Sequence, residues 1–266
     1  MNKHLDHVKE TMLRGAPGVI FTALARRAKI NETEMLRLQS SREEEMRKFL
    51  LVCFALIAVS VSAAFAQETG KSAAAGATTI QLPQPSKSGG MALTEALAHR
   101  RSTRTFTAKP MSQAEISQLL WAAQGITDDK GHRTAPSASA QYYLHIYLAT
   151  PDAFFEYIPA GHQLKKLQSG DLRAKLSVQP VVKSAPFVLL IAGEYERATE
   201  KYGADKGPRV TNLEAGHVAE NVLLQATALG LGAVPVGGFE PKDAQKGASL
   251  PAQQMPIYLI PVGHID

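Results

Sequence analysis

The sequence has almost no cysteine. Cys53 is the only one in 266 residues, and it lies inside an apolar run that begins at Phe49. It is preceded by Val52, which is not the small residue that a lipoprotein anchor requires. If that run is removed during export, the mature protein has no cysteine at all. Disulfides, cysteine-ligated metals and thiol catalysis are then excluded.

Several common catalytic motifs are also missing. The eight histidines show no H-E-x-x-H spacing, so metal catalysis is not expected. The sequence contains neither a G-x-S-x-G elbow nor a P-loop. The short run Gly230-Leu231-Gly232 follows a predicted helix, whereas the glycines of a dinucleotide fingerprint precede one.

The part of the chain that is expected to remain after export has little excess of charge of one sign. The formal net charge is +5, but residues 67–266 carry nineteen Lys and Arg against seventeen Asp and Glu. Because nucleic-acid binding depends on a concentrated basic surface, we expect no nucleic-acid partner.

The first third of the chain has the pattern of an export signal. Met46-Arg47-Lys48 precedes an apolar run over 49–61 and a small-residue site before Gln67. The pattern predicts translation from Met46, a signal peptide over 46–66 and cleavage before Gln67. Residues 1–45 are then an upstream tail that is absent from the mature protein. We expect an exported protein, periplasmic or secreted. The alternative is an uncleaved segment that tethers the protein to the membrane.

A flexible linker is expected over 67–90, which is rich in Ala, Gly, Ser, Thr, Pro and Gln, followed by one domain over 91–266. Hydrophobic spacing predicts helices near 93–100, 112–125, 162–167 and 212–229, and strands near 142–149, 185–192, 232–239 and 257–262. Since helices and strands do not alternate in a regular βα repeat, the pattern favours an α+β layered domain over a doubly wound sheet.

A dense arginine cluster is the most informative stretch. Arg100, Arg101 and Arg104 fall within five residues, together with two hydroxyl side chains. A guanidinium group suits bidentate binding of phosphate or carboxylate, although a solvated basic helix end has the same composition. A small-residue run over 133–140 and the pair Gly237-Gly238 would let a flat ligand approach the backbone. Together these features suit a flat anionic cofactor.

These stretches resemble the FMN-dependent nitroreductase superfamily, and within it the SagB-type branch of thiazole- and oxazole-forming dehydrogenases. The resemblance covers about residues 81–266 and rests on residues 100–106, 119–126, 133–138, 201–203, 214–221 and 230–239. It implies an α+β sandwich with a mixed central sheet flanked by helices. It also implies an intertwined homodimer with two FMN sites at its interface.

The resemblance assigns roles to particular residues. Arg100, Ser102 and Arg104 should hold the phosphate and ribityl region of FMN, with further contacts from Arg101. The isoalloxazine ring should be bordered by the loop Pro136, Ser137, Ala138 and Ser139. In this loop the chain has Ser139, Gln141 and Tyr143 where many members have glycine, leucine and proline.

The same resemblance assigns roles to two further pairs of residues. Gly237 and Gly238 should bring backbone N–H groups near flavin N5, where fixed donors stabilise reduced flavin. Lys201 and Tyr202 match an acid/base pair of azoline-oxidising members.

The resemblance implies hydride transfer between flavin N5 and a small organic substrate, with NAD(P)H as a candidate electron donor. Reduction of nitro compounds, quinones or enones and dehydrogenation of azolines all remain open. The alternative from a different class is an exported flavin-binding redox carrier or structural module without turnover.

Overall fold

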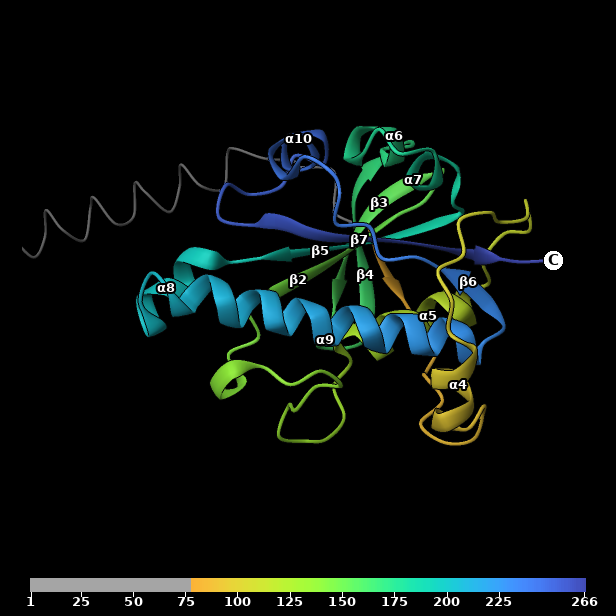
Figure 1. Ribbon diagram of the computed structural model, residues 1–266, viewed down its shortest axis with the longest axis horizontal. Coiled ribbons are helices and arrows are strands. Elements are labelled where there is room, and N and C mark those ends of the chain that lie inside the picture. Colours follow the sequence, from red (N-terminus) through yellow and green to blue (C-terminus); the bar gives the residue numbers. More distant parts are fainter. Residues whose placement is uncertain (1–77) are drawn as a thin grey trace, which may run out of the picture. The chain divides into compact units, whose positions relative to one another are not determined.

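A computed structural model of the chain describes residues 78–266 (Figure 1). Seven strands form one sheet in the order β1-β4-β3-β2-β5-β7-β6. Their bounds are β1 Thr79–Gln81, β2 Leu144–Ala149, β3 Ala153–Ile158, β4 Gln163–Ser169, β5 Phe187–Gly193, β6 Leu231–Ala233 and β7 Met255–His264. All pairings between these strands are antiparallel, and a parallel bridge joins Ser102, which is outside the strands, to Ala233 at the end of β6. The α+β prediction is confirmed, and the sheet expected to be mixed is antiparallel in its seven strands.

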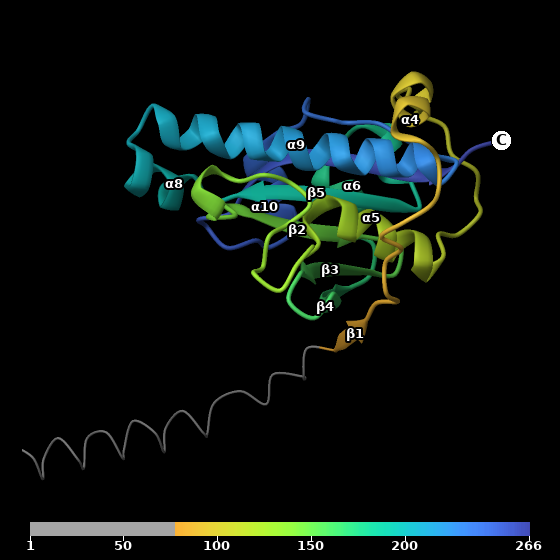
Figure 2. The same ribbon diagram turned by 90° about the horizontal axis from the view of Figure 1, so that it is seen from below.

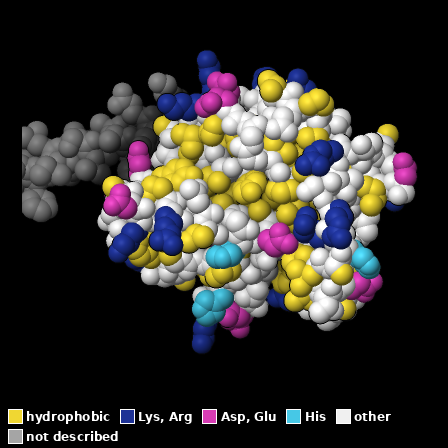
Figure 3. All heavy atoms as spheres, in the orientation of Figure 1, with side chains coloured by type: hydrophobic (Ala, Val, Ile, Leu, Met, Phe, Trp, Pro, Cys, Tyr) yellow, Lys and Arg dark blue, Asp and Glu magenta, His cyan; other side chains and the backbone are white. Residues whose placement is uncertain are grey.

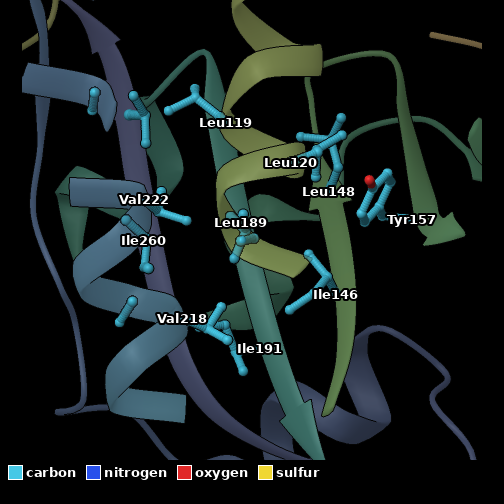
Figure 4. Packing of buried hydrophobic residues seen from close by; sticks show 14 of the residues in the cluster. Leu119, Leu120, Ile146, Leu148, Tyr157, Leu189, Ile191, Val218, Val222 and Ile260 are labelled. Atoms are coloured by element: carbon cyan, nitrogen blue, oxygen red, sulfur yellow. The ribbon is translucent and has the colours of Figure 1, made fainter. Parts of the chain in front are cut away.

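Helices cover both faces of this sheet. They are α4 Leu93–His99, α5 Gln113–Gln124, α6 Arg173–Leu176, α7 Pro180–Ser184, α8 Tyr195–Tyr202, α9 Lys206–Ala228 and α10 Pro241–Gly247. α5 and α9 pack on one face, where Leu119, Leu120, Val218 and Val222 point toward the sheet (Figure 4). A second buried cluster on the other face includes residues of α6 and α7. Figure 2 shows α9 and α5 on the same side of the strands, with β1 at the sheet's edge.

Local sequence signals explain the central elements. Ser112 and Glu115 form a capping box, because each side chain binds the other residue's backbone N–H, and this fixes the start of α5. Every residue of β5 is buried, which accounts for its continuous apolar run. α9 begins at Lys206, six residues before the predicted start, because Pro208 in the first turn needs no N–H partner.

Three predicted segments have a different structure. The strand expected over 232–239 is a strand only in β6, with a single bridge at Val236 beyond it, because Pro235 has no N–H to donate to a ladder. The polar helix expected over 162–167 is the strand β4, whose side chains alternate in burial as they pair with β3. In the expected linker over 67–90, Thr79–Gln81 form β1 on the edge of the sheet and Leu82 is 4% exposed. This part of the linker is therefore ordered, because Ile80 and Leu82 are apolar at strand spacing and pack against the sheet.

The predicted tail over 1–45, the signal peptide over 46–66 and the cleavage point before Gln67 lie outside the described residues. Within 78–266, none of the helices combines the length and the apolar character needed to span a bilayer.

Candidate functional site

The arginine cluster lies where α4 ends. Arg100 caps the helix, and its Nε is 3.7 Å from Oε1 of Glu220 on α9. The Arg101 guanidinium donates hydrogen bonds to the carbonyls of Ala98 and Arg100, so it satisfies the end of its own helix. Arg104 is exposed. Within residues 78–266, the guanidinium groups of Arg100 and Arg104, unlike that of Arg101, make no hydrogen bond to the end of α4.

Strand β6 connects this cluster to the paired glycines. Ser102 bridges Ala233, and the Thr103 N–H donates to the Ala233 carbonyl at 2.9 Å. Gly237 and Gly238 follow four residues later and are exposed. A Cβ atom at Gly237 would meet nothing closer than 4.0 Å, and one at Gly238 nothing closer than 3.5 Å. The backbone here is open to a ligand.

Ser137 in the small-residue loop faces the protein interior. Its hydroxyl donates to Oε2 of Glu214 at 2.6 Å and accepts from the Tyr142 N–H at 2.8 Å. Glu214 is 2% exposed, and burial raises the pKa of its carboxyl. Ser137 thus anchors the loop to α9, while Pro136 and Ser139 are on the exposed side and Ala138 is half-buried.

The next part of this loop has an unusual backbone. Ser139, Ala140 and Tyr142 have φ values of 51°, 52° and 51°, a left-handed conformation that costs non-glycine residues free energy. Hydrogen bonds from α8 hold it: the Tyr202 hydroxyl donates to Ser139 Oγ at 2.9 Å, and Arg197 donates to the Tyr142 carbonyl at 2.6 Å. Strain that the surroundings maintain in this way is typical of ligand-binding loops.

Lys201 and Tyr202 lie in the last turn of α8. The Tyr202 ring also makes an edge contact with Tyr143, with ring centroids 6.4 Å apart. Lys201 is exposed, and its Nζ is 5.8 Å from the centre of the Tyr202 ring. The fold therefore places Tyr202 against the predicted flavin loop and Lys201 on the surface beside it.

The predicted site residues form two groups within one chain. The first joins the arginine cluster to the paired glycines through β6, and the second joins the loop at Ser139 to Tyr202. α4 and α8 lie toward opposite ends of α9 (Figure 1). Arg100 pairs with Glu220, whereas α8 packs near Gly207, about 20 Å away along the helix axis. In residues 78–266, no hydrogen bond or ion pair joins the two groups.

Sequence reasoning missed the buried carboxylate that anchors the loop. Glu214 precedes Val218 and Val222 at four-residue spacing, so it occupies the apolar stripe of α9. A charged residue in such a stripe is an unusual signal that it must have a partner. The part of the chain that the structure describes has no group of three or more metal-ligating side chains arranged to hold an ion.

Known proteins have a similar fold and a similar sequence. A family model described as "Nitroreductase family" matches residues 97–264. A Methanocaldococcus jannaschii protein, provisionally named a nitroreductase, is 39% identical over 194 residues, which are 69% of this chain and 95% of that protein. A crystal structure of a Ralstonia eutropha protein with the same provisional name has 32% identity and a TM-score of 0.67, covering 71% of this chain and 90% of that one.

Two more distant matches are a protein of a trifolitoxin operon and a chain of a microcin synthetase complex. The trifolitoxin operon protein TfxC of Rhizobium leguminosarum is 25% identical over 176 residues, which are 56% of this chain and 49% of that protein. A chain of the Escherichia coli microcin synthetase McbBCD complex has 20% identity and a TM-score of 0.56, covering 70% of this chain and 77% of that one. The second likeness is one of fold alone.

Proposed function

Because this chain belongs to the nitroreductase family, we propose that it is an FMN-dependent oxidoreductase acting on a small organic substrate. FMN, when bound, supplies the hydride chemistry at its N5 atom. The protein's task is to hold the cofactor, to place donors near its polar edge and to position the substrate.

The observation that carries this proposal is the donor set beside β6. Arg100, Ser102 and Arg104 offer two guanidinium groups and a hydroxyl, which is the chemistry that a phosphate requires. The open backbone at Gly237 and Gly238 continues from the same strand, and it leaves space for a flat ring system. These residues fit FMN, with the arginines and Ser102 on its phosphate side.

We propose that the complete site needs a second copy of the chain. The exposed face of α9 carries Leu213, which is 54% exposed, and Gly216, whose Cβ position has no heavy atom within 4 Å. Hydrophobic side chains gather across this face of the molecule (Figure 3). Two α9 helices crossing near Gly216 in antiparallel fashion would bring the arginine cluster of one subunit to the loop of the other.

For the chemistry we propose that Lys201 and Tyr202 are acid/base candidates and that NAD(P)H is the candidate electron donor. Dehydrogenation of an azoline is supported by the contact of Tyr202 with the loop and by the likeness to TfxC. Reduction of a nitro compound is supported by the names of the more similar relatives, and quinones and enones are further candidate substrates. Residues 46–66 support export to the periplasm or beyond, with a membrane tether if they are not removed.

An absorption spectrum of the purified protein tests the proposal. We expect bound FMN that is bleached by NADH or NADPH. Arg100→Ala or Arg104→Ala should weaken FMN binding about 10- to 100-fold, since each removes a charged hydrogen-bond donor. Lys242→Ala, an exposed lysine on α10, is the control and should bind FMN normally.

The opposite results would contradict the proposal in different ways. A colourless protein that takes up no FMN would remove the flavoprotein assignment. A yellow protein that is inert to reductants and substrates would favour the alternative, a flavin-binding carrier. Normal FMN retention in both arginine variants would place the phosphate elsewhere.

A further inference from the structure

A cavity of about 370 Å³ lies behind the loop that contains Ser139. None of the residues proposed to bind FMN lines it. Its walls come from α5, the loop, β2, β3 and the start of α8. The polar part of the lining includes Arg133, Tyr142, His145, Glu156, Glu194 and Arg197, and Leu144, Ile146 and Ile158 add an apolar surface.

The two carboxylates that line this cavity each lie close to a basic side chain of the lining, whereas Arg133 has no carboxylate in direct contact. Glu194 binds both His145, at 3.0 Å, and Arg197, at 2.8 Å. Glu156 Oε1 is 3.5 Å from the other ring nitrogen of His145. Arg133, by contrast, has no carboxylate within 4 Å anywhere in residues 78–266, and the charge of Glu214 acts on it only from farther away.

Neutral groups occupy only part of the Arg133 guanidinium. One of its terminal nitrogens donates to Oε1 of Gln124 at 3.0 Å, and the group lies 4.3 Å over the ring of Tyr142. The side chain is half-buried, and burial lowers its pKa because the charged form loses solvation. Arginine stays charged nonetheless, so this position favours an anion that would offset the cost.

We propose that the cavity binds a small organic carboxylate, held by the Arg133 guanidinium and packed against Tyr142, Leu144 and Ile158. The planar fork of arginine matches the two oxygens of a carboxylate. The apolar wall and the volume suit a ligand with a compact hydrophobic body. This site is separate from the proposed flavin site, and its occupancy does not depend on FMN.

The cavity communicates with the flavin loop through hydrogen bonds. Gln124 accepts from Arg133 and donates to Oε1 of Glu214 at 3.4 Å, and Glu214 accepts from Ser137 at 2.6 Å. A carboxylate on Arg133 would compete for the guanidinium that holds Gln124. Ligand binding should therefore alter the hydrogen bond between Glu214 and Ser137. The cavity is thus a candidate site for regulating the conformation of the loop.

Benzoate is the probe, and benzamide, its neutral isostere, is the control for charge. Isothermal titration of the protein as produced, with and without added FMN, should show saturable benzoate binding and at least tenfold weaker benzamide binding. Arg133→Gln should weaken benzoate binding about 10- to 100-fold, Arg133→Lys less, and Lys242→Gln not at all. Ile158→Trp, which fills the cavity and keeps Arg133, should also abolish it.

The proposal is overturned if benzoate and benzamide bind equally, or if Arg133→Gln and Ile158→Trp leave benzoate binding unchanged. It is also overturned if benzoate competes with FMN and its binding is lost in Arg104→Ala, because the ligand would then occupy the flavin site. If Arg133→Gln does not fold, Arg133→Lys and Ile158→Trp decide the outcome. A protein that lacks FMN but binds benzoate through Arg133 would refute the proposed function and leave this inference standing.

Discussion

At the scale of single residues, a few side chains decide how the loop before β2 is held. Tyr202 and Arg197 bind it from α8, and Glu214 binds it from α9. Ser139 and Tyr143, where the resemblance leads us to expect glycine and proline, both contact Tyr202. The departures therefore change the surroundings of a proposed catalytic residue.

Tyr202→Phe removes the hydroxyl and keeps the ring. If this hydroxyl acts as acid or base, kcat should fall about 100-fold or more, with FMN binding unchanged. Ser139→Ala is the matched control, because it removes the hydrogen-bond acceptor and leaves the Tyr202 hydroxyl in place, so its effect on kcat should be smaller. Steady-state kinetics with a quinone, a nitroaromatic and an azoline substrate measure this. Unchanged kcat in both Tyr202→Phe and Lys201→Ala would exclude the pair from the mechanism.

His145 predicts a pH dependence of stability. Burial by itself would lower its pKa, but hydrogen bonds to Glu156 and Glu194 outweigh burial, so the pKa is raised. The folded state then binds the proton more tightly than the unfolded state. The resulting stabilisation is complete below the unfolded pKa of about 6.5 and is lost as the pH rises through the folded pKa.

Urea unfolding of wild type and His145→Gln between about pH 5.5 and pH 8.5 tests this prediction. The difference in unfolding free energy should be largest at the acidic end and should shrink as the pH rises. Glu156→Gln removes one partner and should flatten the dependence. A difference that does not vary with pH would contradict the assignment.

At the scale of elements, the close packing of α8 on α9 positions Tyr202. Gly207 in the first turn of α9 lies against α8, and a Cβ atom there would be 2.5 Å from the Thr199 backbone nitrogen. Because the clash is with backbone, a side chain at this position must move the helix. α8 carries Tyr202 and α9 carries Glu214, and both side chains hold the loop before β2. The position of this loop therefore depends on the contact between the two helices.

Gly207→Ala should therefore destabilise the protein by about 1–3 kcal/mol and weaken the hold of α8 on the loop. Glu200→Ala on α8 is the control, because this side chain is exposed and alanine is a good helix former. Urea unfolding measures both, and proteolysis of the loop before β2 reports its release. Equal stability of the two variants would contradict the packing argument.

At the scale of the whole molecule, the two groups of site residues predict a shared active site. Subunits carrying Arg100→Ala with Arg104→Ala should be inactive, and so should subunits carrying Tyr202→Phe. Refolding them as a mixture should restore about a quarter of wild-type activity, because half of the dimers are mixed and each has one intact site. If each subunit forms its own site, mixing will restore nothing.

Gly216→Leu provides a separate test of the dimer. A Cβ atom at this position meets no heavy atom of the described residues within 4 Å, so the subunit should fold with a leucine on this exposed face of α9. The leucine should nevertheless prevent two α9 helices from crossing closely, and sedimentation should show a monomer that has lost FMN. A dimer with normal FMN content would move the interface away from Gly216.

The sequence by itself determined the elements whose signals are local. The capping box at Ser112 and the apolar run of β5 predicted their positions because a helix start and a buried strand depend on near neighbours. The composition and order of the motifs, including the arginines at 100–104 and the glycines at 237–238, were enough to indicate the family that the comparisons show.

Only the tertiary structure decided which side chains face a ligand and which support the fold. Arg101 caps its own helix, Ser137 turns inward to Glu214, and Arg133 opens into a cavity. The polar segment at 163–169 became a strand because β3 offered it an edge to pair with. Such outcomes depend on contacts between residues far apart in the chain, and no local pattern of residue types carries that information.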